Sequence, residues 1–175
     1  MPSSFSFLFW RSYSKIVNKM VKAVAVLGQT HADETVEESD ADGTVTFSQE
    51  GNRQTRVGGR FTDLEPDGAY ALVIHQYGDI RDGWKSTGDR FKPAGIAGVI
   101  AHFVADDEGT ARFDLGTKAD LSGENSVMSR GLVLHVFDSS NPCLNVSSGS
   151  IPRPDINWDK YLGPGVDWAV IGLAR

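Results

Sequence analysis

The chain has 175 residues and a mass of 19.0 kDa, which fits one ordinary domain, and its composition of 40% apolar and 23% charged residues is globular rather than disordered or fibrous. Seventeen Lys and Arg against 23 Asp and Glu give a net charge of −6, which argues against non-specific nucleic-acid binding. No apolar run approaches the ~20 residues of a membrane helix, and the single cysteine, Cys143, excludes an internal disulfide and a cysteine-cluster metal site.

Residues 1–19 differ from the rest of the chain. They begin with an apolar, serine-bearing run that ends at Trp10, basic residues follow it, and no acid occurs before Asp33. Organelle-targeting presequences have this composition. The alternative is a disordered extension, with Met20 as a second start. We therefore divide the chain into an extension at 1–19 and one domain at 20–175.

From Met20 onward the sequence predicts short strands, with alternating or β-branched patterns bounded by Gly, Pro and Asp turns. The expected strands are 21–27, 43–49, 59–64, 69–77, 97–104, 110–115, 131–137 and 168–174. No stretch predicts a long amphipathic helix. Residues 28–42 are acidic and predict a loop, and residues 138–165, rich in Ser, Asn, Pro and Gly, predict a long irregular segment. This pattern favours an antiparallel sandwich or barrel.

Several segments resemble the copper/zinc superoxide dismutase family in order and spacing. They are residues 20–27, 43–47, 64–68, 75–79 and 170–174, extended by 105–109 and 130–135. The motif His75-Gln76-Tyr77-Gly78-Asp79 is also similar to the dismutase-like domain of the copper chaperone for this enzyme. The resemblance implies an all-β fold, an eight-stranded antiparallel Greek-key β-barrel of the immunoglobulin-like sandwich type. Because fold alone does not carry function, each site residue must be compared in turn.

The copper ligands implied by the resemblance are only half present. The family's first two ligands form His-x-His on one strand, and period-two spacing puts both on one face. Here Val73 replaces the first and His75 retains the second. Arg90, before Phe91-Lys92-Pro93, stands where the family has the histidine that bridges copper and zinc, and a permanently charged guanidinium cannot ligate. The last copper histidine matches His135. His75 and His135 are therefore the residual metal-ligand positions.

The zinc site is missing from the sequence pattern. The family has a long His- and Gly-containing loop after Phe-x-Pro, but here only four residues separate Pro93 from Gly98, and Val99 stands at the family's carboxylate position. We expect no zinc ligand to remain. His31 and His102 match no ligand; we expect His31 in a loop and His102 on a strand, facing solvent or the barrel interior.

Two further parts of the family's site are replaced. Gly165 stands where the resemblance places an arginine that attracts superoxide. Trp84 and Trp168 stand where the family has the two cysteines of its disulfide. We predict that these two tryptophans lie close together and join the loop after Asp79 to the last strand.

Other residues have ordinary explanations. Cys143 has no obvious basic neighbour that would lower its pKa, so we expect an unreactive thiol. The sequon Asn145-Val146-Ser147 matters only in a secreted chain. Tyr77-Gly78-Asp79 and Ile171-Gly172 resemble the family's dimer interface, or else serve turn and core packing.

These comparisons predict a catalytically inactive superoxide dismutase-like protein, a pseudoenzyme without catalytic or cofactor-binding residues. Its partners would be a second copy of itself, a true dismutase or the copper chaperone, with no role for nucleic acid or membranes. The alternative is a dismutase or weak copper-binding protein that uses His75 and His135. We expect no zinc and at most weak copper binding. The expected location is cytoplasmic, or mitochondrial if residues 1–19 are a presequence.

Overall fold

The computed structural model describes residues 19–28, 41–93, 97–138 and 156–174. Its strands are β1 Met20–Leu27, β2 Asp42–Glu50, β3 Thr55–Thr62, β4 Ala69–Ile74, β5 Arg81–Trp84, β6 Val99–Val104, β7 Ala111–Thr117, β8 Gly131–Phe137, β9 Leu162–Val170 and β10 Gly172–Leu173. The helices in the described residues are two 3-10 turns, η1 Lys85–Thr87 and η2 Trp158–Lys160. None is long and apolar enough to cross a membrane.

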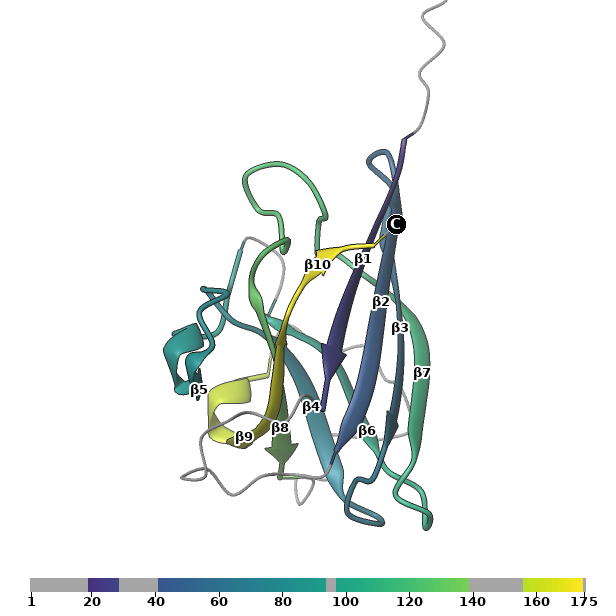
Figure 1. Cartoon of the computed structure of the whole chain (residues 1–175), viewed down its shortest axis with the longest axis vertical. Helices are drawn as coiled ribbons and strands as arrows, with labels where there is room; N and C mark the ends of the chain where they lie inside the picture. The colour runs from purple at the N-terminus through teal and green to yellow at the C-terminus, as the bar shows by residue number, and fades with distance from the viewer. Residues whose placement is uncertain (1–18, 29–40, 94–96, 139–155, 175) are drawn as a thin grey trace, which may run out of the picture.

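Two antiparallel sheets form the molecule (Figure 1). One has the strand order β10-β1-β2-β3-β7 and the other has the order β6-β4-β8-β9. The chain crosses from one sheet to the other between β3 and β4 and returns between β6 and β7, so strands distant in sequence become neighbours. The eight long strands, two sheets and absence of long helices among the described residues confirm the predicted all-β Greek-key architecture.

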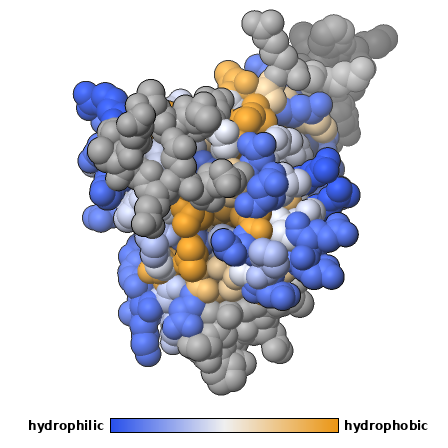
Figure 2. Space-filling model, turned by 60° about the horizontal axis from the view of Figure 1, so that its bottom comes forward, coloured by the Kyte–Doolittle hydropathy of each residue, from blue (hydrophilic) through white to orange (hydrophobic). Residues whose placement is uncertain are grey.

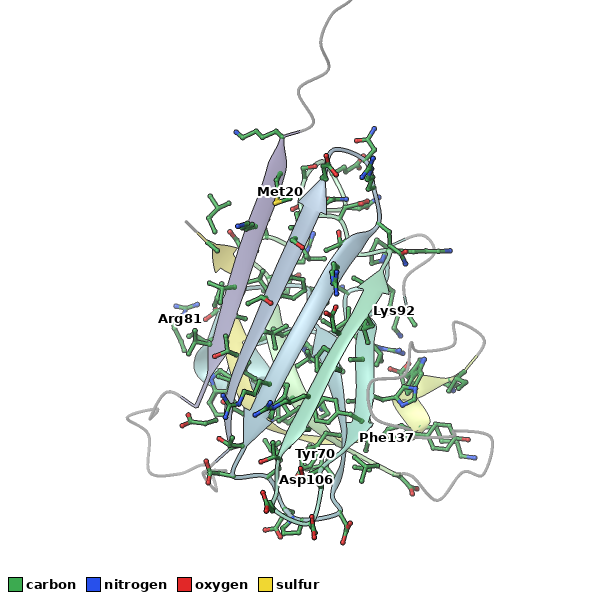
Figure 3. All side chains as sticks on the ribbon, turned by 90° about the vertical axis from the view of Figure 1, so that its right-hand side faces the viewer. Met20, Tyr70, Arg81, Lys92, Asp106 and Phe137 are labelled. Atoms are coloured by element: carbon green, nitrogen blue, oxygen red, sulfur yellow. The ribbon has the colours of Figure 1, made fainter. Side chains whose placement is uncertain are left out.

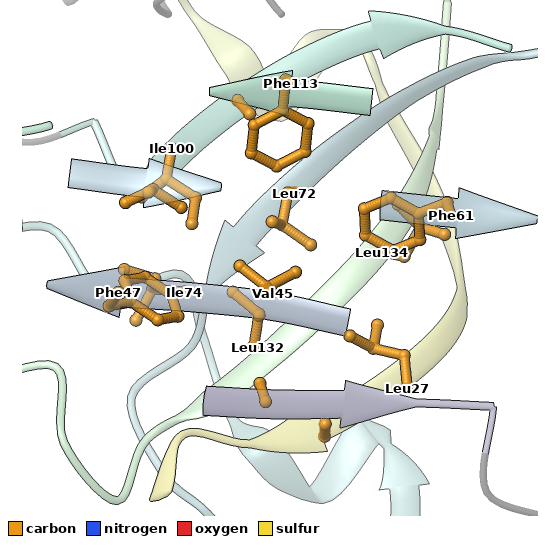
Figure 4. Close-up of a cluster of buried hydrophobic side chains, with 14 of the residues drawn as sticks. Leu27, Val45, Phe47, Phe61, Leu72, Ile74, Ile100, Phe113, Leu132 and Leu134 are labelled. Carbon is orange, nitrogen blue, oxygen red and sulfur yellow. The ribbon is translucent and has the colours of Figure 1, made fainter. Parts of the chain in front are cut away.

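Alternation along the strands explains the core between the sheets. In β2, Val45 and Phe47 are buried while Thr44 and Thr46 are exposed, as period two requires. Side chains from both sheets meet in one apolar cluster (Figure 4). Phe103 lies near its centre, with ring centroids 5.2 Å from Phe61 and 5.5 Å from Phe113.

Three of the predicted strand boundaries that differ from the structure show why they moved. β3 starts at Thr55 rather than residue 59, because residues 55–62 pair continuously with β2 or β7. β4 ends at Ile74, because Gln76 and Tyr77 donate their N–H groups to the carbonyls of Asp89 and Thr87 instead. β9 starts at Leu162, inside the segment expected to be irregular. Pro164 is compatible with β9 because this strand is an edge of its sheet, where a missing N–H costs no ladder bond.

The described part of the face in Figure 2 is mostly polar. In Figure 2 hydrophilic residues cover much of the visible face, and hydrophobic residues gather in limited patches. The large hydrophobic side chains that the described surface exposes are Met20, Val26, Tyr77, Ile80, Val136 and Leu173. The predicted extension at 1–19 lies outside the described residues except for Lys19, so its nature stays a prediction.

Candidate functional site

The predicted site residues lie on the outer face of the four-stranded sheet, away from the main core. β4 and β8 pair directly, with Ala71 opposite His135. In Figure 1, β5, η1 and η2 all lie on this side of the molecule, next to β9. The site is therefore a strand surface with short covering segments, and its residues come from positions far apart in the sequence.

His75 and His135 converge as predicted. Their Nε2 atoms are 3.1 Å apart, and their rings are stacked with centroids 5.3 Å apart and an interplanar angle of 10°. Both side chains are about 95% buried, since each retains only 5% of its exposure. The pairing of β4 with β8 brings these two residues together across 60 positions of sequence.

Hydrogen bonds at the Nδ1 atom hold each imidazole ring in place. His75 Nδ1 lies 2.7 Å from the Gly88 carbonyl and 2.8 Å from Thr87 Oγ1. The Thr87 hydroxyl donates to the Trp84 carbonyl, so its oxygen is free to accept and His75 Nδ1–H is the donor. His135 Nδ1 likewise donates to the Gly163 carbonyl at 2.8 Å. Both Nε2 lone pairs therefore face one another, the tautomer that metal-ligating histidines usually have.

Burial disfavours the charged form of both imidazoles. Desolvation is the main cause that lowers the pKa of His75, and it lowers the pKa of His135 to about 4. The positive charge of Arg90 adds to the shift of both histidines. The two rings are therefore neutral at physiological pH, with the lone pairs needed for ligation.

The neighbouring ligand position is apolar, as predicted. Val73 is fully buried in a second apolar cluster on the outer face, together with Ala71, Val99, Phe137 and Trp158. Trp158, from η2, is also fully buried and covers this cluster. Where the resemblance implies a histidine and a carboxylate, the strands present two valines that pack under an indole.

Arg90 lies next to the histidine pair, but its guanidinium group hydrogen-bonds to other residues. It forms an isolated β-bridge with His75. Its guanidinium donates to the Ala97 carbonyl at 2.7 Å and to Asp159 at 2.6 Å, and its side chain is only 8% exposed. Lys92 binds the other oxygen of Asp159 at 3.0 Å. The residue at the bridging position thus ties the β4–β6 connection to η2.

Trp84 and Trp168 join the loop to β9, but not as the expected aromatic pair. Among the described residues no ring contact links these two indoles. Instead each indole packs against a glycine of the opposite segment. Trp168 lies against Gly83, where a Cβ would be 3.1 Å from its ring, and Trp84 lies against Gly165, where a Cβ would be 2.7 Å from its Cγ. The Trp84 ring also meets the His135 ring edge-on, with centroids 5.6 Å apart. Two indoles are too large to replace a disulfide side by side, so each uses a glycine gap.

His102 lies on a strand, β6, as expected, but the expectation for the side it faces was wrong. It faces neither solvent nor the barrel interior, but lies buried on the outer face between Phe137 and Trp158, with ring centroids at 5.9 and 5.4 Å. The η2 segment covers a strand face that the sequence pattern alone would leave open. His31, Cys143 and the sequon at 145–147 lie outside the described residues. Within those residues no group of three or more His, Cys, Asp or Glu could hold a metal ion.

Sequence reasoning missed three residues of this region. Trp158 covers the outer face, Asp159 anchors Arg90 and Lys92, and Asp167 is a buried acid on β9. Trp158 offered a signal, because a tryptophan in a polar loop is costly unless it is buried. Asp159 gave none, since its partners Arg90 and Lys92 are distant in sequence, and Asp167 gave none, since its burial depends on how the two sheets pack.

Residues 41–141 match the family model of copper/zinc superoxide dismutase. The match spans more than half of the chain and includes His75, Arg90 and His135. With its fold, this match places the chain in the copper/zinc superoxide dismutase family. The described donors nevertheless do not fit the family's pair of metals, because two imidazoles face each other while Val73, Val99 and Arg90 stand at other ligand positions.

Proposed function

We propose that this family member is a catalytically inactive dismutase-like protein whose role is to bind a partner. The observation that carries the proposal is the arrangement around His75 and His135. Only these two imidazoles point at one another, the adjacent ligand position is a buried valine, and the bridging position holds a guanidinium. Two nitrogen ligands cannot supply the coordination that a copper ion needs when it cycles between oxidation states.

The surroundings also oppose superoxide chemistry. Arg90 is permanently charged, and its β-bridge with His75 places it beside the histidine pair. A metal cation at the pair would be repelled by it. The indole of Trp84 fills the space beside Gly165, so the arginine of active family members would need that ring to move.

The test is metal loading followed by an activity assay. The purified full chain is incubated with copper and zinc, desalted, and analysed for both metals and for superoxide decay. We expect no retained zinc, copper well below one equivalent, and decay no faster than that of free copper at the same concentration. Near-stoichiometric copper with fast, cyanide-sensitive turnover would refute the proposal.

Restoring ligands sharpens this test. The double variant Val73→His, Arg90→His recreates the ligand types implied by the family at both positions, and Val73→Leu, Arg90→Gln is the matched control. We expect the first to retain more copper than the wild type and the control to retain no more. If both behave alike, lost ligands are not what limits metal binding.

A second candidate function, weak copper binding, is favoured by one observation. With both Nδ1 atoms donating to carbonyls, two Nε2 lone pairs lie 3.1 Å apart with no proton between them. His75 and His135 could hold a monovalent copper ion, which accepts few ligands and suits imidazole. Competition with a colourimetric copper(I) chelator tests it: His135→Gln should lose binding, whereas His102→Gln should retain it.

The partner would be a second copy, a true dismutase or the copper chaperone. Tyr77 is 58% exposed and Ile80 38% exposed on the loop that resembles the family's dimer interface, which supports a contact surface there. Ile171, in contrast, is fully buried and serves the core. Sedimentation of the chain alone, and mixed with a purified dismutase or chaperone, tests association. Tyr77→Asp should weaken it, and an unchanged complex would exclude this surface.

The cellular location also stays a proposal. We favour the cytoplasm, with mitochondria as the alternative if residues 1–19 act as a presequence. Fluorescent fusions of the full chain and of a version starting at Met20 separate the two. Mitochondrial signal that requires residues 1–19 would establish the alternative.

A further inference from the structure

The outer face of the five-stranded sheet places two arginines directly opposite one another. Arg60 on β3 and Arg112 on β7 are register partners, and both are exposed because they alternate with the buried Phe61 and Phe113. Directly opposite residues on antiparallel strands have Cβ atoms ~4.5–5.5 Å apart. Figure 3 shows this face, with its strands running side by side in front. Two guanidinium groups thus share one small area of surface.

Neither arginine forms an ion pair among the described residues. Arg56, on the same strand, shows the usual solution: it forms two bonds of 2.7 and 2.6 Å to the carboxylate of Asp114. No ion pair or hydrogen bond involves the side chain of Arg60 or Arg112 in the described part of the chain. Like charges directly opposite each other destabilise a sheet, so this pair has a cost that a bound anion would remove.

A hollow of about 550 Å³ adjoins the pair. It is lined by both arginines, by Thr110 and by Asp106 and Glu108 of the β6–β7 turn. Asp106 is committed to that turn, since one carboxylate oxygen accepts the N–H groups of Glu108 and Thr110 at 3.1 and 2.7 Å. Both acids line the hollow, but within the described part of the chain neither is in an ion pair with Arg60 or Arg112. The hollow therefore combines two free guanidinium forks with a rim of negative charge.

We propose that the Arg60–Arg112 pair is a binding site for a phosphate ion. A guanidinium binds oxyanions through two parallel N–H···O bonds, so two facing forks need an ion with more acceptor oxygens than one carboxylate offers. A phosphate ion has enough for both. The acidic rim repels every anion, including phosphate, so only an ion that forms bidentate bonds with both guanidinium groups gains enough to bind, and chloride cannot form them. This site lies on the opposite sheet from the histidine pair and is independent of the dismutase-like function.

Thermal unfolding of the full chain at constant ionic strength tests the proposal, with phosphate replacing chloride step by step. We expect a saturable rise in Tm with phosphate in the wild type, and a dissociation constant at least about tenfold weaker in Arg60→Gln and in Arg112→Gln, as loss of charge-assisted bonds implies. Arg81→Gln is the matched control, because Arg81 is an exposed arginine paired with Asp79 elsewhere. Without phosphate, either site variant should be as stable as the wild type or more so.

Three results would overturn the site. The first is no saturable effect of phosphate on the wild type. The second is an equal effect in Arg60→Gln and Arg112→Gln, which would place binding elsewhere. The third is an equal loss of phosphate affinity in Arg81→Gln, which would show that the effect depends only on the net charge of the protein. Calorimetric titration of phosphate into the same four proteins gives an independent readout that does not depend on unfolding.

Discussion

The two faces of the sheet β6-β4-β8-β9 are both buried, but different structures cover them. On the inner face Leu72, Ile74 and Leu134 pack against the other sheet. On the outer face Val73 lies under η2, one short segment. Strand alternation assigns neighbouring residues of β4 to opposite faces. Within the described residues, the inner face is closed by a whole sheet, and the outer face by short segments that include η2 with Trp158 and β5–η1 with Trp84.

The cover on the outer face explains how the strand surface stays buried at the positions where the resemblance implies metal ligands. The outer face carries apolar residues at 73 and 99, and Trp158 covers them. Arg90 and Lys92 both bind Asp159, which fixes the same segment by charge. Apolar packing and an ion-pair network thus hold a cover over the strand surface. The inner face needs no such ion-pair network, because its apolar side chains pack against the long strands of the other sheet.

The largest effect is expected from the inner face. Phe103→Ala removes a fully buried ring from the centre of the main core, so the free energy of unfolding should fall by about 3–5 kcal/mol. Chemical denaturation with a two-state fit measures it. Tyr77→Ala is the control, since that ring is 58% exposed and should cost far less. A loss below about 1 kcal/mol for Phe103→Ala would mean that the core tolerates the cavity.

Asp167 is an acidic residue on the otherwise apolar inner face, and its burial predicts that the stability of the protein depends on pH. Its partner in β8 is the inward-facing Leu134. One carboxylate oxygen accepts the Trp168 N–H at 2.7 Å, while the other has no hydrogen-bond partner. Desolvation, with a contribution from Asp42, raises its pKa from 3.8 to about 7.

The folded state therefore holds this proton more tightly than the unfolded chain. The contribution of the protonated Asp167 carboxyl to the unfolding free energy is fully present below about pH 4. It decreases as the pH rises toward 7 and is lost above pH 7, and the total loss is at most about 4 kcal/mol. Asp167→Asn keeps the shape without the charge. The difference in unfolding free energy between variant and wild type should grow from pH 4.5 to pH 8 in favour of the variant. A difference that does not change with pH would show that Asp167 titrates normally.

The outer face should respond more locally. Trp158→Ala removes an equally buried ring, but the segment at 156–162 can detach without opening the barrel, which limits the loss of global stability. We expect a smaller fall than for Phe103→Ala. Amide exchange should accelerate in the outer strand residues and around η2, with little change in β2. Equal losses for the two variants would show that both faces belong to one cooperative unit.

The same difference separates what sequence could predict from what it could not. Alternation and turns predicted the sheets, because inner residues such as Val45 and Phe47 depend on the period of one strand. The resemblance placed His75 and His135, whose approach follows from the pairing of β4 with β8. Trp158 above His102, and Asp159 beside Arg90, depend on how a loop folds back, and no local period encodes that. The packing of Trp84 on Gly165 likewise required the spatial arrangement.

A smaller effect is expected where Trp84 meets β9. Gly165→Ala introduces a Cβ 2.7 Å from Trp84 Cγ, so the ring must shift, at a cost of about 1–3 kcal/mol. In a Trp84→Ala background the added methyl group should cost much less. Urea denaturation of both single variants and the double variant gives the coupling energy. Additive losses would mean that another contact sets the cost, for instance Val133 Cγ1, which would lie 2.8 Å from the same Cβ.

The smallest effect concerns His102, and it has the opposite sign. Its Nδ1 is buried without a hydrogen-bond partner, and desolvation lowers the pKa of the imidazole, so the ring is neutral and acts as an aromatic spacer between Phe137 and Trp158. Replacing a buried polar group that has no partner by an apolar one of similar shape is neutral or stabilising. His102→Phe should therefore raise the unfolding free energy by up to about 1 kcal/mol, and slow exchange around η2. His135→Phe is the contrast, because it breaks the bond from Nδ1 to the Gly163 carbonyl and should destabilise. If His102→Phe were also destabilising by more than about 1 kcal/mol, the larger ring would not fit under Trp158, and the outer face would be packed as tightly as the inner one.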